Sequence, residues 1–170
     1  MSERGFTLVE VMVVIVVMGI VASLVMMNIS GMDQRKAMQA REILIFDLKH
    51  INRLANEQGQ VLALELKPYQ DGTLYQLMQY SVEATDLNHT WQKFNIFTSK
   101  TLPYEMRLEI TAIQQNYTNA TNQALLAEQA PKLMWLGNGE AKPVRIQVYF
   151  QERPLGHEIE IDYLGKVHEK

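Results

Sequence analysis

Residues 6–27 read Phe6-Thr-Leu-Val-Glu-Val-Met-Val-Val-Ile-Val-Val-Met-Gly-Ile-Val-Ala-Ser-Leu-Val-Met-Met27, and Glu10 is the only charged residue among them. A helix of about 22 residues rises about 33 Å, which exceeds the roughly 30 Å hydrocarbon core of a bilayer. In lipid, a helix also satisfies its backbone hydrogen bonds within one segment. The stretch therefore predicts a membrane-spanning helix.

Length alone leaves three interpretations of this stretch open. A cleaved signal peptide would use Arg4 as its basic region and Ala22-Ser23 as its small-residue exit. The apolar part of such peptides usually covers about 7–15 residues, which is shorter than this stretch, and a carboxylate at Glu10 is unexpected there. A plain membrane anchor fits the length equally well. The third interpretation, a processed assembly helix, depends on the residues where the stretch begins.

The residues around the start of the stretch form a specific pattern. A short polar leader with a basic residue, Met1-Ser-Glu-Arg4, ends in Gly5, and the aromatic Phe6 and then Glu10 follow. This pattern resembles the signature of the type IV prepilin family. The resemblance implies that prepilin peptidase cleaves the chain between Gly5 and Phe6, and that the new amine of Phe6 is N-methylated.

The resemblance also gives Glu10 a role. A carboxylate at the centre of a membrane helix costs at least about 2.5 kcal/mol on insertion scales, and less near the interface, so a compensating partner is expected. Without the leader pattern, a carboxylate that reaches the lipid headgroups would be the simpler interpretation. The family implies instead that Glu10 pairs with the N-terminal amine of a neighbouring subunit and sets the axial register of a filament.

The same resemblance predicts the orientation of the chain. It implies a single-pass protein of the bacterial inner membrane, with a cytoplasmic leader and a periplasmic globular domain. The rule that basic residues stay on the cytoplasmic side gives little guidance here. Glu3 offsets Arg4 before the helix, and the basic residues Arg35, Lys36 and Arg41 follow it. The leader pattern decides the orientation, because the leader has to meet its peptidase on the cytoplasmic side.

The segment after the apolar stretch also has a helical pattern. Leu44, Leu48 and Ile51 recur at spacings of three and four residues and form one apolar stripe. Arg41 and Asp47 are predicted to lie off this stripe. We expect one long helix that is loosened around residues 28–31 and ends before a glycine at position 59.

Alternating apolar residues and turn-forming residues predict antiparallel strands after the helix. Turns are expected at residues 68–72, 137–139 and 154–156, and a loop insertion at residues 114–130. A long helix packed on an antiparallel sheet is an α+β fold, with the helix covering one face of the sheet. The predicted strands cover residues 60–67, 73–82, 91–97, 105–113, 132–136, 144–150 and 157–163. The expected organisation is a leader at 1–5, a membrane and assembly helix at 6–29, a periplasmic half-helix at 30–58 and a β-rich domain at 59–170.

The C-terminal region narrows the resemblance. Pro131 to Glu140 contains an apolar strand and a glycine turn, Pro143 opens the next strand, and residues 159–167 end in another glycine turn. This ending resembles the H-type minor pseudopilins of type II secretion systems. The resemblance implies a subunit near the tip of a periplasmic pseudopilus. Its implied partners are the major pseudopilin, the other minor pseudopilins of the tip complex and an inner-membrane assembly platform, with membrane lipid before assembly.

A related alternative stays open, because minor type IV pilins share the same domain pattern. Such a subunit would serve pilus assembly, twitching or DNA uptake. The formal net charge is −3 and the basic residues are scattered, whereas nucleic-acid binding favours a clustered basic face. We therefore expect no nucleic-acid partner.

The sequence contains no recognisable catalytic pattern. It has no cysteine, no HExxH, no P-loop and no GxSxG motif. Glu158, Glu160 and Asp162 share one strand face, for which a solvated surface is a simpler interpretation than a cation site. The four histidines are His50, His89, His157 and His168, and no two have metal-ligand spacing. We therefore expect a structural subunit with no cofactor or metal, and not an enzyme.

The leader pattern generates the first prediction. Gly5→Ala is expected to leave the precursor uncut, because the peptidase implied by the resemblance acts at the bond between Gly5 and Phe6. Mass spectrometry of the membrane-bound chain would show the full-length mass. Normal maturation of the variant would contradict the prediction.

Overall fold

The computed structural model describes residues 7–69, 72–81, 91–113 and 130–170, with side chains of residues 25–31 left out. These residues form two compact units, residues 1–36 and residues 37–170. Each unit is described by itself. The expected turn at 68–72 lies partly, and the loop at 114–130 almost wholly, outside the described residues.

Helix α1 covers Leu8–Gln58 without interruption and contributes to both units. The expected loosening around residues 28–31 was wrong. No proline lies in this region, and a single glycine inside a helix costs only about 1 kcal/mol relative to alanine. Gly59 ends α1 with a φ of +60°. The Gln60 N–H donates to the Ala55 carbonyl at 3.2 Å, which is the hydrogen bond of a Schellman cap.

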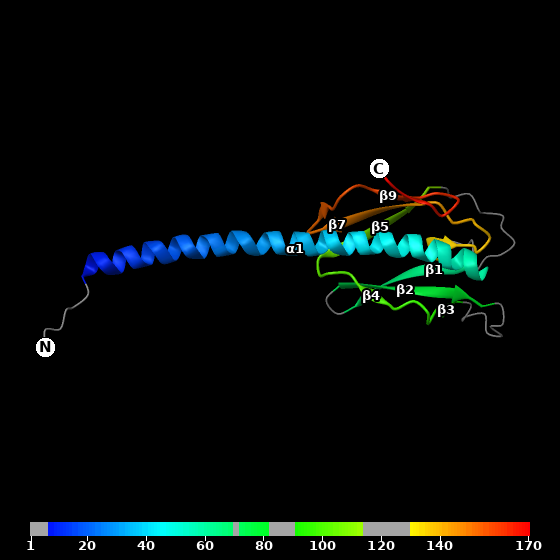
Figure 1. Cartoon of the computed structure of the whole chain (residues 1–170), viewed down its shortest axis with the longest axis horizontal. Helices are drawn as coiled ribbons and strands as arrows, with labels where there is room; N and C mark the ends of the chain where they lie inside the picture. Colours follow the sequence, from blue (N-terminus) through cyan, green and yellow to red (C-terminus); the bar gives the residue numbers. More distant parts are fainter. Residues whose placement is uncertain (1–6, 70–71, 82–90, 114–129) are drawn as a thin grey trace. The chain divides into compact units, whose positions relative to one another are not determined.

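The strands of the second unit form two antiparallel sheets (Figure 1). The first sheet has the order β3-β2-β1-β6, with β4 beside β2. Its strands are β1 (Leu62–Tyr69), β2 (Gly72–Tyr80), β3 (Trp91–Lys93), β4 (Lys100–Thr101) and β6 (Leu133–Trp135). The second sheet has the order β10-β9-β7-β5, with β8 beside β7. Its strands are β5 (Met106–Ala112), β7 (Val144–Phe150), β8 (Arg153–Pro154), β9 (Ile159–Ile161) and β10 (Val167–Glu169).

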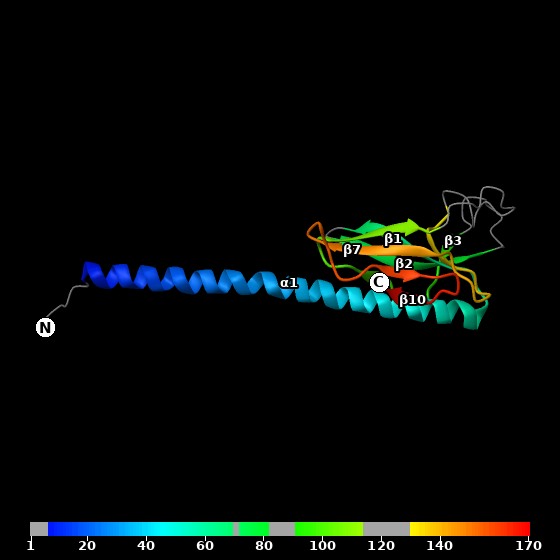
Figure 2. The same cartoon turned by 90° about the horizontal axis from the view of Figure 1, so that it is seen from above.

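The α+β class is confirmed, but the sheet is divided in two. Figure 1 shows β1 to β4 on one side of the C-terminal half of α1, and β5, β7 and β9 on the other. Figure 2 shows both sheets on the same side of this half-helix when it is seen from above. Leu44, Leu48 and Ile51 have no exposed surface. They belong to one core cluster with Leu62 of the first sheet and Ile146 of the second, so one helix face serves both sheets.

Several strand boundaries differ from those expected. Strands β4, β8 and β10 were not predicted, and the strand expected at 91–97 ends at Lys93. An additional turn, which was not predicted, lies at Gln151 and Glu152 with φ values of +50° and +62°, ahead of the turn expected at 154–156, where Gly156 has a φ of +71°. Strand β1 continues through Pro68. The backbone N–H and C=O groups of Lys67 point to β2, so those of Pro68 point to the opposite edge of β1. Proline is tolerated there, because no ladder hydrogen bond to β2 needs its missing N–H.

Asp47 was expected off the apolar stripe of α1, but only 4% of its surface is exposed. The Tyr75 hydroxyl donates to its Oδ2 at 2.6 Å, and the Lys100 ammonium lies 2.7 Å from both carboxylate oxygens. Burial, followed by the hydrogen bond to Asp47, raises the pKa of Tyr75 far above its ordinary value. These contacts join α1 to β2 and β4 and satisfy a carboxylate that would otherwise be costly to bury.

Arg41 was also expected off the stripe and is 2% exposed. Its Nη2 donates to the carbonyl of His157 at 2.7 Å and to Oε2 of Glu169 at 2.9 Å. Gly156 leaves room for this side chain, because a Cβ at that position would lie 2.8 Å from Nε of Arg41. Arg41 therefore ties the C-terminal strands of the second sheet to α1.

The Asp47 cluster generates the second prediction. Asp47→Ala is expected to lower the free energy of unfolding by about 3 kcal/mol, because it leaves the Tyr75 hydroxyl and the Lys100 ammonium without their buried partner. Urea unfolding of the detergent-solubilised chain, followed by tryptophan fluorescence, measures this change. Asp33→Ala is the control, since Asp33 is 54% exposed in a helix-surface pair with Lys36. Equal stability of the two variants would count against the prediction.

Candidate functional site

The residues predicted to direct processing lie at the N-terminal end of the chain. Gly5 and Phe6 fall outside the described residues, so cleavage between them and methylation of Phe6 stay predictions. Glu10 is described and stands in the first turn of α1. A carboxylate is favourable at this end of a helix, because the helix dipole places partial positive charge there.

Thr7 caps this end of α1. Its Oγ1 accepts a hydrogen bond from the Glu10 N–H at 3.3 Å, and its carbonyl accepts one from the Val11 N–H at 3.3 Å. Thr7 was not predicted as a site residue, although the Thr-x-x-Glu spacing of a capping box would have identified it. The cap uses the backbone N–H of Glu10 and not its side chain. Within the described residues, the Glu10 carboxylate forms no hydrogen bond or ion pair.

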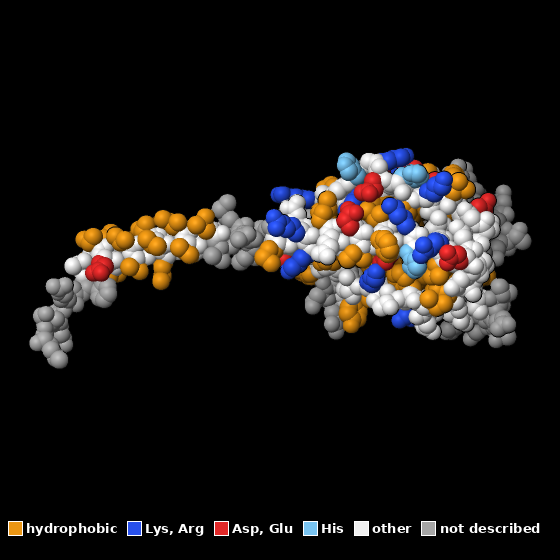
Figure 3. All heavy atoms as spheres, viewed as in Figure 1, with side chains coloured by type: hydrophobic (Ala, Val, Ile, Leu, Met, Phe, Trp, Pro, Cys, Tyr) orange, Lys and Arg blue, Asp and Glu red, His pale blue; other side chains and the backbone are white. Residues whose placement is uncertain are grey.

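The part of α1 from residue 8 to residue 24 carries apolar side chains on all sides. Figure 3 shows hydrophobic atoms over most of this segment, with acidic atoms at one place. No helix within the described residues is both long and apolar enough to cross a membrane. The predicted span of 6–27 reaches beyond the described side chains at both ends. A helix that is apolar all round is typical of a segment covered by lipid or by other helices. Its large, substantially exposed side chains include Leu8, Val9, Val11, Met12, Val13, Val14, Ile15, Val16, Val17, Met18, Ile20, Val21 and Leu24.

The acidic side chains Glu158 and Glu160 near the C-terminus form ion pairs with nearby basic side chains. Glu160 contacts the Lys170 ammonium at 2.8 Å and Nε of Arg145 at 3.4 Å. The hydrogen bond from Lys170 is the main cause that lowers the pKa of Glu160. Glu158 lies 3.9 Å from Nε of Arg145. These ion pairs make the face a solvated charge network.

Asp162 closes the turn that leads into β10. Its Oδ1 accepts the backbone N–H groups of Leu164 and Lys166, each at 2.9 Å, and its Oδ2 lies 2.9 Å from Nε2 of His168. Burial alone would raise the pKa of Asp162, but the bonds from His168, Lys166 and Leu164 outweigh it and lower the pKa. Across the described ranges, no group of three or more His, Cys, Asp or Glu side chains has the arrangement of a metal site.

Comparison with known proteins places these features in context. Residues 1–26 match the family model described as the prokaryotic N-terminal methylation motif. The chain is 23% identical over 177 residues to type II secretion system protein H of Pectobacterium carotovorum subsp. carotovorum, covering 97% of this chain and 91% of the relative. A shorter match of 30 residues is 70% identical to type II secretion system core protein G of Klebsiella michiganensis and covers 18% of this chain and 21% of that protein.

Solved structures share the fold. A crystal structure of the minor pseudopilin EpsH from the type II secretion system of Vibrio cholerae superposes with a TM-score of 0.57 at 16% identity, covering 80% of this chain and 94% of EpsH. A second EpsH structure gives a TM-score of 0.56 at 17% identity, covering 79% and 94%. The resemblance to H-type minor pseudopilins inferred from the sequence is confirmed, as is the pilin-like α+β fold.

Proposed function

We propose that this chain is an H-type minor pseudopilin, a structural subunit near the tip of the type II secretion pseudopilus. In this role it supports the export of folded proteins across the outer membrane. The observation that carries the proposal is the similarity to a type II secretion protein H along 97% of the chain, joined to a methylation motif at residues 1–26. A minor type IV pilin would share the motif, but these relatives of the globular domain are secretion proteins.

The N-terminal segment has two successive roles in this proposal. Before assembly, residues 6–29 cross the inner membrane, with the leader in the cytoplasm and the globular domain in the periplasm. Prepilin peptidase then cuts between Gly5 and Phe6, and the new amine of Phe6 is methylated. After assembly the same apolar helix packs among the helices of neighbouring subunits, which cover the side chains that lipid covered before.

Glu10 connects the two roles. In the membrane its carboxylate is costly to bury, and in the filament it pairs with the terminal amine of a neighbouring subunit. Thr7 supports this role because its hydroxyl caps α1 at the Glu10 N–H and leaves the carboxylate to another partner. The pair neutralises both charges and sets the axial position of one subunit against the next.

The proposed partners follow from this assembly. They are the major pseudopilin, the other minor pseudopilins of the tip complex, prepilin peptidase and the inner-membrane platform that drives filament growth. The chain itself performs no chemistry in this proposal. Its rigid core, formed by one helix face and two sheets, serves to present surfaces to these neighbours.

Deletion of the gene tests the function directly. The deletion strain is expected to retain folded exoproteins in the periplasm and to keep its pili, because only the secretion pseudopilus lacks a subunit. Enzyme assays of the medium and the periplasm measure the distribution. Normal secretion would contradict the proposal, and loss of twitching with intact secretion would favour the type IV pilin alternative.

Glu10→Ala tests the pairing role. The variant is expected to insert into the membrane and to be cleaved, because its apolar helix and its leader are unchanged, but to enter the filament poorly. Cysteine cross-linking to the other pseudopilins measures incorporation, and Asp33→Ala is the control with a helix-surface carboxylate removed. Cross-linking of Glu10→Ala at the wild-type yield would count against the pairing.

A further inference from the structure

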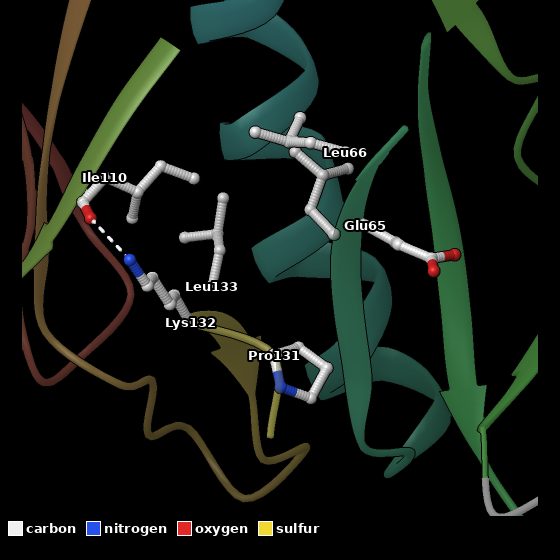
Figure 4. Close-up of a pocket in the computed structure, with 7 residues that line it drawn as sticks. Glu65, Leu66, Ile110, Pro131, Lys132 and Leu133 are labelled. Carbon is white, nitrogen blue, oxygen red and sulfur yellow. Dashed lines mark hydrogen bonds between the residues drawn. The ribbon is translucent and has the colours of Figure 1, made fainter. Parts of the chain in front are cut away.

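Each sheet of the second unit ends in an edge that faces a shared pocket. Strand β5 is the last strand of the second sheet, and β6 pairs with β1 only along Leu62 to Leu64. The pocket has a volume of about 280 Å³, and its lining includes Leu66, Ile110 and Leu133. Figure 4 shows these side chains reaching into the space between β1, β5 and β6.

The hydrogen bonds at both ends of β5 show which of its backbone groups point away from β7. The Gln151 N–H donates to the Glu105 carbonyl at 3.2 Å, and the Ile113 N–H donates to the Pro143 carbonyl at 3.1 Å. Odd-numbered residues of β5 therefore face β7, since hydrogen-bonded pairs alternate along an antiparallel ladder. Leu108 and Ile110 direct their N–H and C=O groups away from β7. The Lys132 ammonium, 3.5 Å from the Ile110 carbonyl, contacts it on that open side.

Strand β1 has a corresponding stretch with which no described strand pairs on the side away from β2. The Tyr80 N–H donates to the Val61 carbonyl at 2.9 Å, so odd-numbered residues of β1 face β2 and even-numbered residues face the other edge. Strand β6 covers that edge only as far as Leu64. The next outward position is Leu66, and the pairing register places Pro131, which has no N–H, opposite it. The ladder between β1 and β6 therefore stops at the pocket.

The charge at this opening is unbalanced. The Glu65 carboxylate turns towards β2 in Figure 4. There it accepts a hydrogen bond from Nε2 of Gln76 at 2.8 Å and forms an ion pair with the Lys67 ammonium at 3.2 Å. Lys132 contacts only a neutral carbonyl at 3.5 Å among the described residues. The rim of the pocket therefore carries a positive charge that favours a carboxylate.

We propose that this opening is a docking site for an extended segment of another protein. The segment adds as a strand to the open edge of β5, places an aliphatic side chain in the pocket and directs a carboxylate to Lys132. A helix would fill the apolar space but would leave the outward N–H and C=O groups of Leu108 and Ile110 without partners, whereas a strand pairs with them. The site goes beyond the proposed function, because filament packing through the N-terminal helix does not use this edge.

Site-specific photo-cross-linking tests the strand geometry in the full-length, membrane-bound chain. Benzoylphenylalanine replaces Glu109 or Thr111, two exposed residues on the outer face of β5. Cross-links from the two positions are expected to map two residues apart on a single segment of one partner, since side chains on one strand face repeat every second residue. Cross-links scattered over several segments, or confined to residues 114–129 of the same chain, would overturn the proposal.

Proline substitution tests the backbone pairing. Leu108→Pro removes an outward N–H without a ladder bond to β7, so it is expected to lower the cross-link yield about fivefold or more. Val167→Pro is the matched control at the opposite edge of the same sheet. The Asp162 N–H donates to the Lys166 carbonyl and the Lys170 N–H donates to the Glu158 carbonyl, so the even-numbered residues of β10 bond β9 and the N–H of Val167 points outward. The side chains of Leu108 and Val167 are both partly buried against the core. An equal loss in both variants, or none in Leu108→Pro, would overturn the proposal.

Charge reversal tests the carboxylate of the partner. Lys132→Glu is expected to reduce the cross-link yield, because it places a negative charge beside the carboxylate of the partner. Lys93→Glu, at the far edge of the first sheet, is the control and is expected to leave the yield unchanged. Equal yields from the wild type and both variants would show that Lys132 is not part of the site. The mass of the chain is recorded in each sample, because leader removal reports on the proposed function independently. Mature chains that give no cross-link at either β5 position would overturn the docking site alone.

Discussion

The buried face of α1 is the constraint on which the globular unit depends. Leu44, Leu48 and Ile51 are fully buried, and the core cluster around them draws residues from both sheets. Burial of apolar surface is worth roughly 25 cal/mol per Å², so a helix face that serves two sheets contributes to both at once. Each sheet can then leave an edge open near the other, because the helix holds them together.

Two buried polar side chains of α1 form hydrogen bonds that fix the position of the helix on the sheets. Asp47 bonds strands of the first sheet through Tyr75 and Lys100, and Arg41 bonds the second sheet through His157 and Glu169. Apolar contacts alone tolerate sliding of a helix along a sheet, whereas these hydrogen bonds are satisfied at one position only. Each sheet thus has its own polar anchor on α1.

The sequence predicted well those features that are local in the chain. The leader pattern, the helical stripe and strand β7 at residues 144–150 all follow from spacing within one segment, and β7 was predicted with its observed bounds. Strands of two or three residues, such as β4 and β10, carry no period that can be recognised. Arg41 and Asp47 were misplaced because their partners lie far away in sequence. At the candidate site, Glu10 was predicted, whereas Thr7 was missed despite its capping-box spacing.

The contact between Arg41 and Glu169 also sets an order of events in biosynthesis. The two residues are 128 positions apart, so the guanidinium is synthesised long before its carboxylate partner. Until Glu169 has been synthesised, Arg41 has to remain hydrated or be buried at a considerable cost. The second sheet can therefore complete its packing on α1 only after the last residues of the chain have been made.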